Sequence, residues 1–264
     1  MENKITIVSC FYIIAENEKR NINDYIYWLS IFLNYIKHPI VFFSDGAMAD
    51  TIDSLKRVTQ PNAPWKCIRK PLDKLGFQEK EWEDYWIECC KKGTNGRVNN
   101  PNVYRIWANK LLLLEEVARE NPFNTEQYYW CDGACWRNEE LARIVGDTWK
   151  LPITDDFHFA WVENFGRYTS AEEILLQANT TTIGGAIFGG NKNMIEKIKK
   201  RFCLMYEVAR RHKLIDLNDQ GVLAAAVFDM KNIIHWNAKE YPVLPGCDPW
   251  FLFQYLGLLV EFHR

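Results

Sequence analysis

The sequence predicts an α/β fold with a mostly parallel central sheet and helices on both of its faces. Two observations carry this prediction. Short apolar segments of strand length alternate with longer segments of helical spacing along most of the chain. Several of the short segments, such as Pro-Ile-Val-Phe-Phe at 39–43, are too apolar to leave one face in water. Strands of that kind are typical of a parallel sheet that is covered on both sides.

The first half of the chain supplies four predicted strands and four predicted helices. A β-branched run opens the first strand, and Asn121-Pro122 stops the last helix. We expect strands at 4–12, 39–43, 65–68 and 127–131, and helices at 21–36, 48–58, 78–92 and 103–120.

The second half continues the alternation, with Gly189-Gly190 predicted as the turn into a long helix. We expect strands at 157–162, 181–188 and 232–236, and helices at 171–178, 192–212 and 219–228. The apolar stretch 250–260 is too short to span a bilayer, and we expect a terminal helix packed on the core rather than an interfacial one. Since no repeat or long linker interrupts the chain, residues 1–264 are predicted to form a single domain.

Composition excludes several classes of protein. Of the 264 residues, 48% are hydrophobic and 25% charged, as in a globular protein with a large core. The 32 basic and 34 acidic residues give a net charge of −2, so no overall field attracts nucleic acid or an anionic membrane.

Cysteines and tryptophans are both numerous. The eight cysteines show neither Cys-x-x-Cys pairs nor zinc-finger spacing, so we expect free thiols and a cytoplasmic location. The 11 tryptophans suit a thick aromatic core, and they suit sugar stacking as an alternative.

Polar groups follow three of the predicted strands. They are Cys10-Phe11-Tyr12, Ser44-Asp45 and Asp132. Each group alone is explained by a turn or a helix cap. Ligands of open α/β sheets bind beyond the carboxyl ends of the strands, so together the three groups predict one binding cleft.

A lysine on the apolar face of helix 103–120 adds to this cleft. At 100° per residue, Lys110 lies near the centre of a stripe of apolar side chains. Its ammonium either extends to solvent or reaches into the cleft toward a phosphate or an acidic partner such as Asp132. Asn109 is expected on the polar side of the helix.

Asp132 is followed by the small residues Gly133 and Ala134, and Arg137 comes five positions later. A strand-end carboxylate can hold a divalent cation that binds a diphosphate, and a guanidinium binds phosphate directly. One carboxylate is a poor metal site, so Mn²⁺ or Mg²⁺ is a conditional prediction.

Three later features complete the set of candidates. Gly184-Gly185 allows close approach of the backbone to a ligand. Asp219 is either a helix cap, a role it shares with Asn218, or a general base for an acceptor hydroxyl. His235 is either a core histidine or a metal ligand together with Asp132.

The order of these motifs resembles a known family. Val-Ser-Cys-Phe-Tyr at 8–12, Asn109-Lys110, Asn-Pro-Phe-Asn-Thr at 121–125 and Tyr-Tyr-Trp-Cys-Asp-Gly at 128–133 resemble the bacterial HtrL/YibB/WlaTC-like proteins. Members of that family are regarded as candidate glycosyltransferases.

With Gly184-Gly185 and Asp219-Gln220 added, the order also resembles glycosyltransferases of the GT-A fold. The resemblance implies a nucleotide-sugar-dependent transferase with an Asp-x-Asp that binds metal and diphosphate, glycines that line the sugar pocket and an acidic residue near the acceptor. This chain departs from the pattern at Asp132-Gly133-Ala134, which lacks the second carboxylate.

The resulting hypothesis is an enzyme that moves a sugar from a nucleoside diphosphate sugar to a glycan or other hydroxyl acceptor. The donor-binding residues are Cys10, Phe11, Tyr12, Ser44, Asp45, Asn109, Lys110, Asp132, Gly133, Arg137, Gly184 and Gly185, with Asp219 as the catalytic candidate. Two alternatives are a nucleotidyltransferase, for which Asp155-Asp156 is the only adjacent pair of aspartates, and a non-catalytic carbohydrate-binding protein.

Overall fold

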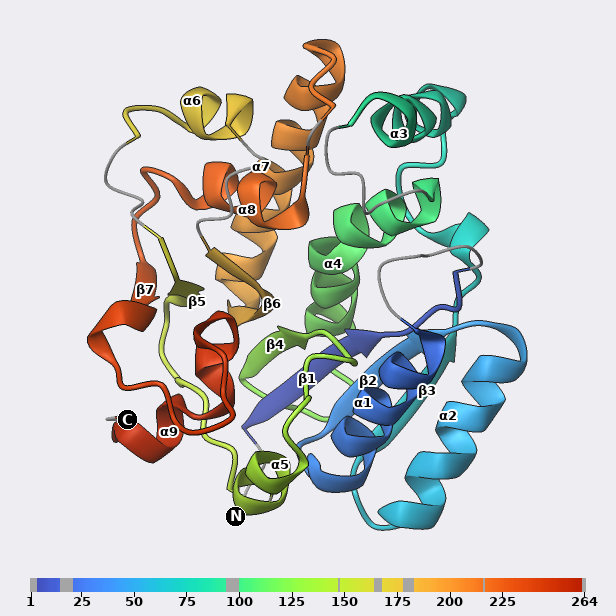
Figure 1. The fold of residues 1–264 in the computed structure, drawn as a ribbon, viewed down its shortest axis with the longest axis vertical. Helices are drawn as coiled ribbons and strands as arrows, with labels where there is room; N and C mark the ends of the chain where they lie inside the picture. The colour runs from blue at the N-terminus through green and yellow to red at the C-terminus, as the bar shows by residue number, and fades with distance from the viewer. Residues whose placement is uncertain are drawn as a thin grey trace.

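The computed structural model describes residues 4–14, 21–93, 100–146, 148–163, 168–177, 183–215 and 217–262. Within this part of the chain seven strands form one sheet in the order β3-β2-β1-β4-β6-β5-β7 (Figure 1). The strands are β1 (Ile5–Cys10), β2 (Ile40–Ser44), β3 (Trp65–Arg69), β4 (Gln127–Cys131), β5 (Phe157–Trp161), β6 (Ile183–Asn191) and β7 (Ile233–Asn237). All pairs are parallel except the two that β6 makes, so the predicted α/β fold with a mostly parallel sheet is confirmed.

Helices cover both faces of the sheet, and each face has its own hydrophobic cluster (Figure 1). One face carries α3 (Lys80–Lys92), α4 (Pro101–Glu120), α6 (Ala171–Leu176), α7 (Lys192–Arg211) and α8 (Asp219–Val227). The other carries α1 (Ile22–Tyr35), α2 (Gly46–Thr59), α5 (Glu139–Val145), α9 (Leu256–Leu259) and the 3₁₀ segment η4 (Pro249–Gln254). Two shorter 3₁₀ segments are η1 (Leu72–Lys74) and η3 (Ala238–Glu240).

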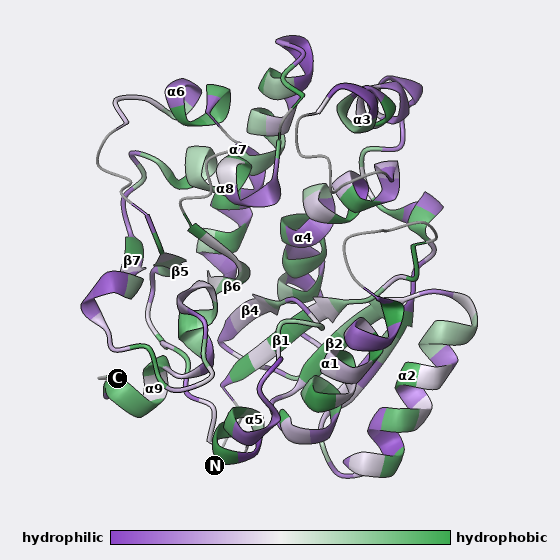
Figure 2. Cartoon of the chain, viewed as in Figure 1, coloured by the Kyte–Doolittle hydropathy of each residue, from purple (hydrophilic) through white to green (hydrophobic). Residues whose placement is uncertain are grey.

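Strand β2 explains why residues 39–43 show no alternation of apolar and polar side chains. All of its residues are buried, with Val41 and Phe43 in the cluster of one face and Ile40 and Phe42 in that of the other. Successive side chains of a strand point to opposite sides, so a strand covered twice must be apolar throughout. In Figure 2 the region labelled β2 is largely green, hence hydrophobic, whereas α2 at the edge mixes green, white and purple.

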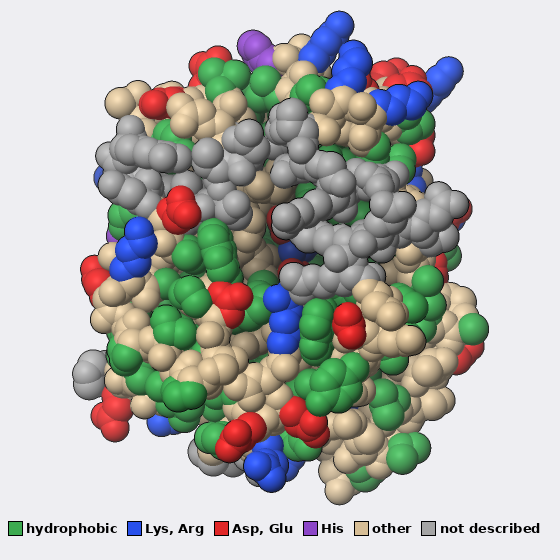
Figure 3. Space-filling model, viewed as in Figure 1, with side chains coloured by type: hydrophobic (Ala, Val, Ile, Leu, Met, Phe, Trp, Pro, Cys, Tyr) green, Lys and Arg blue, Asp and Glu red, His purple; other side chains and the backbone are tan. Residues whose placement is uncertain are grey.

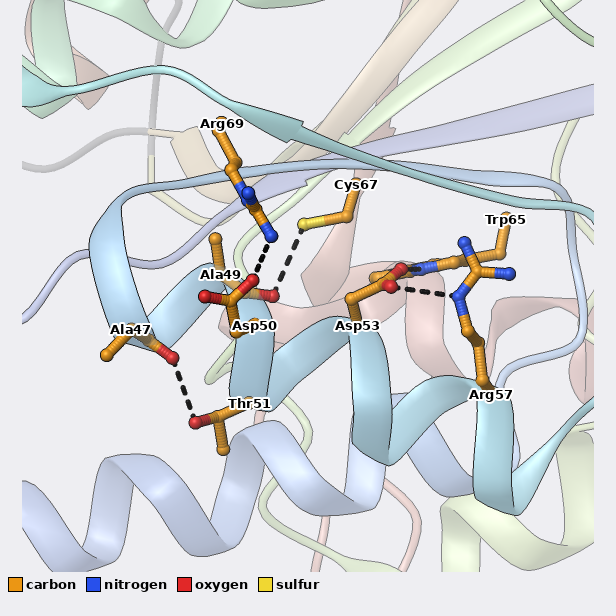
Figure 4. Close-up of polar contacts among 9 residues, drawn as sticks. All are labelled: Ala47, Ala49, Asp50, Thr51, Asp53, Arg57, Trp65, Cys67 and Arg69. Atoms are coloured by element: carbon orange, nitrogen blue, oxygen red, sulfur yellow. Dashed lines mark hydrogen bonds and ion pairs between the residues drawn. The ribbon is translucent and has the colours of Figure 1, made fainter.

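Polar contacts hold α2 on the edge strand β3 (Figure 4). The carboxylate of Asp53 accepts hydrogen bonds from Trp65 Nε1 at 2.7 Å and from Arg57 Nε at 2.8 Å. Asp50 forms an ion pair with Arg69. The bonds of Asp53 to Trp65 and of Asp50 to Arg69 tie the helix to the outer strand, whereas Arg57 belongs to α2 itself.

Most predicted elements are present within a few residues of their expected bounds, but three expectations were wrong or incomplete. Gly189 and Gly190 form no turn; they continue β6, where a Cβ on Gly189 would lie 2.2 Å from the carbonyl oxygen of Tyr128. Helix α5 was not predicted. The segment 250–260 packs on the core as expected, although it is a kinked 3₁₀ segment followed by α9.

Residues 178–182, where a predicted helix ends and a predicted strand begins, lie outside the described part. Among the helices that are described, none has the length and apolarity needed to cross a bilayer.

A buried lysine donates hydrogen bonds to the carbonyl groups at the C-terminal end of α1. Lys56 is fully buried and its ammonium donates hydrogen bonds to Leu33 O at 3.0 Å, Ile36 O at 2.8 Å and Gln60 Oε1 at 2.9 Å. The two carbonyls belong to the last turn of α1 and to its C-cap residue, where no helical N–H is available to them. Burial lowers the pKa of Lys56 to about 7.

We expect this lysine to make stability depend on pH. In the unfolded chain the pKa of a lysine is about 10.4, so between pH 7 and 10 the unfolded state binds a proton that the native state has lost. The free energy of unfolding should therefore rise with pH over this range in the wild type, and less so in Lys56→Met. Urea denaturation at pH 7 and 9 measures the difference. The exposed-site control Lys66→Met should follow the wild type; equal pH slopes in all three would contradict the prediction.

Candidate functional site

The carboxyl ends of β1, β2 and β4 meet at one edge of the sheet. Ser44 Oγ donates a 2.6 Å hydrogen bond to Phe11 O, which ties the end of β2 to the segment after β1. A Cβ on Gly133 would lie 3.2 Å from Ser9 Oγ and 3.4 Å from Cys10 O. The three strand-end groups are therefore neighbours, as the sequence predicted.

Lys110 of α4 stands at the centre of this edge. Its Nζ lies 2.8 Å and 3.0 Å from the two carboxylate oxygens of Asp132 and 2.5 Å from Asp219 Oδ2. It also donates to Gly185 O at 3.1 Å. Of the two orientations considered for Lys110, the structure shows the inward one, with Asp132 as a partner. Four positions far apart in the sequence thus meet at one ammonium group.

The carbonyl of Gly185 is available because β6 is irregular at this point. Phe159 and Ala160 are adjacent on β5, but their partners on β6 are Phe188 and Gly184, so 185–187 bulge out of that pairing. A Cβ on Gly185 would lie 2.6 Å from Gln220 Cγ and 3.2 Å from Asp219 Oδ2, so a larger residue would displace these side chains. The bulge turns a ladder carbonyl into a ligand of Lys110.

Burial and charge oppose each other within this cluster. Burial lowers the pKa of Lys110, but the carboxylates of Asp132 and Asp219 raise it more, and the net shift is upward. Burial raises the pKa of Asp219, and the charge of Lys110 offsets part of that shift. The exposed fractions of the side chains are 5% for Lys110, 11% for Asp219 and 37% for Asp132, so Asp132 presents the cluster to solvent.

Asp219 is not the cap of its helix. Asn218 takes that role, because its Oδ1 accepts from Gly221 N at 2.7 Å, and Asp219 is the first residue of α8. The carboxylate of Asp219 is therefore left for the site, where it meets Lys110.

Trp130 also belongs to the site and was missed in the sequence. Its indole Nε1 donates to Asp132 Oδ1 at 2.7 Å, and its ring lies 5.9 Å from Lys110 Nζ. The signal was present, because residues two apart on a strand point to the same side. Trp130 fixes one carboxylate oxygen of Asp132.

Tyr12 and Asp45 lie at the end of the site formed by β1 and β2. Tyr12 is buried and its hydroxyl donates to Lys70 O at 2.9 Å. Burial raises the pKa of Tyr12, and the charge of Asp45 adds to this. Asp45 precedes α2 and makes no capping hydrogen bond with its side chain; its carboxylate is partly exposed and close enough to Tyr12 to act on the pKa of that hydroxyl.

Arg137 is exposed in the loop between β4 and α5. Its guanidinium carbon lies 4.8 Å from the ring centre of Trp28 and 4.8 Å from that of Phe251. Two rings that flank a guanidinium restrict its orientation. Arg137 is therefore a positioned cation in the loop that begins at Asp132.

Two candidates occupy other places than expected. Asn109 is buried, and its side chain accepts from Gly76 N at 2.6 Å and donates to Gly76 O at 3.2 Å, so the expectation that it points to the polar side was wrong. Gly184 packs against the backbone of Trp250, as a Cβ there would lie 2.8 Å from Trp250 O.

His235 is neither buried nor near Asp132. It is exposed on β7, with Trp161 as a ring contact at 4.8 Å, and β6 and β5 separate β7 from β4. The expectation of a core histidine was wrong. With strands about 4.8 Å apart, the two backbones are on the order of 14 Å from each other.

The described residues do not fit a resident divalent metal. No group of three or more His, Cys, Asp or Glu side chains in this part of the chain is arranged to hold one. The two acidic groups that do approach each other, Asp132 and Asp219, are both engaged by Lys110. An ammonium between them repels a further cation.

The molecular surface is hollowed over the elements that build the site. Figure 3 shows the hollow near the centre of this face, over α4 and β6, with acidic and basic side chains visible inside it. These are the helix and the strand that meet at Lys110 and Gly185.

The comparisons with known proteins give one extensive match. The family model described as "Bacterial protein of unknown function (HtrL_YibB)" matches residues 3–242. No curated protein matches the sequence significantly.

Three solved structures are distantly similar, each at 10% sequence identity. Mouse xyloside xylosyltransferase 1 in its apo form has a TM-score of 0.44, with 87% of this chain and 83% of that chain covered. Core-mannan synthase A from Aspergillus fumigatus in its Mn/GDP form has a TM-score of 0.49, with coverages of 96% and 84%. A mannosyltransferase from S. cerevisiae has a TM-score of 0.49, with coverages of 88% and 68%.

We expect Lys110→Ala to lower the free energy of unfolding by about 3–5 kcal/mol, because it leaves the buried Asp219 without its partner. The control Lys70→Ala breaks a partly exposed pair with Glu116 and should cost about 1 kcal/mol or less. Urea denaturation measures both. Adding Asp219→Asn to Lys110→Ala should restore part of the loss; equal costs for the two lysines would contradict this account.

Proposed function

The chain belongs to the HtrL_YibB family of bacterial proteins of unknown function, and from its site we propose that it is a glycosyltransferase. The donor is a nucleoside diphosphate sugar, and the acceptor is a hydroxyl group of a glycan or of another molecule. The order of motifs in the sequence, which resembles that of GT-A glycosyltransferases, supports this proposal.

One observation carries the proposal: Asp132, Gly185 and Asp219 meet around Lys110 at the carboxyl edge of the sheet. The resemblance to GT-A enzymes links these positions with diphosphate, sugar and acceptor, although Asp132 and Asp219 are 87 positions apart in the sequence. The fold brings them within contact of one side chain. An open α/β sheet binds its ligands at this same edge.

The site has distinct groups for the parts of the donor. Tyr12 and Asp45, at the ends of β1 and β2, are assigned to the nucleoside. Arg137 is assigned to the diphosphate, because its planar fork suits phosphate oxygens. Asp132 is assigned to hydroxyl groups of the sugar, since its carboxylate is partly exposed and accepts hydrogen bonds. Gly185 lets the backbone approach the sugar closely.

Asp219 is assigned to the acceptor side. In an inverting reaction its carboxylate would take the proton of the attacking hydroxyl, and in a retaining reaction it would position the sugar. A base must be ionised. Contact with Lys110 favours the ionised form of Asp219 and so counteracts the effect of burial. The anomeric configuration of the product, followed by NMR, separates the two roles.

The pair Asp155-Asp156, on which the nucleotidyltransferase alternative depends, lies away from the site. Asp155 and Asp156 precede β5, which runs in the same direction as β4, so they lie at the amino edge, opposite to Asp132. Asp156 is engaged there by Asn232 Nδ2 at 3.2 Å and by Thr154 Oγ1 at 3.3 Å. Paired carboxylates are what that chemistry needs.

The carbohydrate-binding alternative loses its stacking platform. All 11 tryptophans fall within the described residues, and none of them is exposed. Trp82 and Trp86, for example, stack on each other with ring centres 5.2 Å apart inside the cluster of α3, α4 and α7. Five of the tryptophans are buried and six are partly buried, so none forms an exposed platform.

We expect UDP or GDP to raise the melting temperature and ATP to leave it unchanged, because the proposed site recognises a diphosphate. At 100 times the dissociation constant, a ligand stabilises the native state by about 2.7 kcal/mol. A thermal-shift series with the three nucleotides measures this. A response to ATP alone, or to none of them with or without Mn²⁺, would remove the proposal.

We expect Asp132→Asn to lower the turnover of the preferred nucleotide sugar by about 100-fold or more, as loss of a charged site group does. The matched control is Asp155→Asn at the opposite edge, which should retain wild-type turnover. Release of nucleoside diphosphate from a panel of nucleotide sugars provides the assay, with circular dichroism to show that both variants fold. Unchanged turnover in Asp132→Asn would exclude Asp132 from the site.

A further inference from the structure

The hydrogen-bond and ion-pair partners of Lys110 Nζ among the described residues are all oxygen atoms. Four of them lie 2.5–3.1 Å from Nζ, three from carboxylates and one from the carbonyl of Gly185. Carboxylate and carbonyl oxygens are the ligands that Mg²⁺, Mn²⁺ and Ca²⁺ take in proteins. The oxygen cage has the composition of a metal site, and an ammonium occupies it.

We propose that Lys110 is the permanent cation of this cage, so that the free protein binds no divalent metal between Asp132 and Asp219. The same oxygens become a metal site once the ammonium is removed. Which cation occupies the cage is a property of the free protein, whatever reaction the site performs. The inference about the cage can therefore be wrong while the proposed glycosyl transfer is right, and the reverse.

The position of Lys110 on α4 makes the occupation permanent. Leu111 beside it and Leu113 and Leu114 one turn further on are buried, and the lysine side chain itself is only 5% exposed. The aliphatic stem is thus held in the core while the ammonium reaches the oxygens. Unlike a metal ion, this cation cannot dissociate, since it is attached to the chain.

A metal ion and the ammonium exclude each other. A divalent ion bound to both carboxylates would lie within about 3 Å of Nζ, where like charges repel strongly in a site with little water. Trp130 restricts the site further, because its indole N–H already occupies Asp132 Oδ1. The cage thus holds one cation at a time.

Removal of Lys110 tests the inference directly. Mn²⁺ is the probe, and the amplitude of its free-ion EPR signal reports how much of it the protein binds. We expect the wild type to bind no more Mn²⁺ than Asp132→Asn does. Lys110→Met keeps most of the aliphatic stem and should bind one Mn²⁺ per chain at least about tenfold more tightly than the wild type.

Two controls distinguish the cage from unspecific binding. Adding Asp219→Asn to Lys110→Met should abolish the new site, because one carboxylate is lost. Lys70→Met frees Glu116, which has no second carboxylate in its ion pair, and should create no site.

A destabilised variant still gives an answer. If Lys110→Met or Lys110→Ala folds only when Mn²⁺ is present, as shown by melting curves, the metal has replaced the ammonium and the inference holds. Folded variants that bind Mn²⁺ no better than the wild type would overturn it. So would a wild-type protein that binds one Mn²⁺ and loses it in Asp132→Asn, a comparison that needs neither lysine variant.

Discussion

The contact of Lys110 with two carboxylates and a carbonyl connects the parts of the molecule that matter for function. A buried ammonium without partners costs several kcal/mol, so α4 can carry Lys110 on its apolar face only if partners reach it. They come from the end of β4, from β6 and from the start of α8. The requirement to pair one charge therefore fixes how four elements meet.

Strand β6 makes this arrangement possible. It is the one antiparallel strand of the described sheet, so its first residues lie at the same edge as the last residues of β1 and β4. In a regular strand the carbonyls form hydrogen bonds with neighbouring strands. The bulge at 185–187 leaves the carbonyl of Gly185 outside this pairing with β5. In the same place Ala186 O accepts from Asp132 N at 2.8 Å, which holds the start of the Asp132 loop.

The sequence was most informative where one periodic pattern decided the outcome. Strand β2 was predictable because burial on both faces leaves no polar residue from Ile40 to Phe43. The apolar stripe of α4 around Lys110 made an inward direction of its side chain one of two alternatives. Gly189 was misread, since glycine in a strand and glycine in a turn look alike until the neighbouring Tyr128 carbonyl is placed. The bulge at Gly185 and the surroundings of His235 depend on pairing between distant strands, which periodicity does not contain.

The charge balance of the cluster suggests how a donor would be oriented. Two carboxylates face one ammonium, and Asp132 is the most exposed of the three side chains. In the proposed reaction the carboxylate of Asp132 repels the diphosphate and accepts hydrogen bonds from sugar hydroxyls. The diphosphate is then directed to Arg137, whose guanidinium is held between Trp28 and Phe251. Repulsion of the diphosphate by Asp132 and its attraction by Arg137 would allow the nucleotide sugar only one binding orientation in the site.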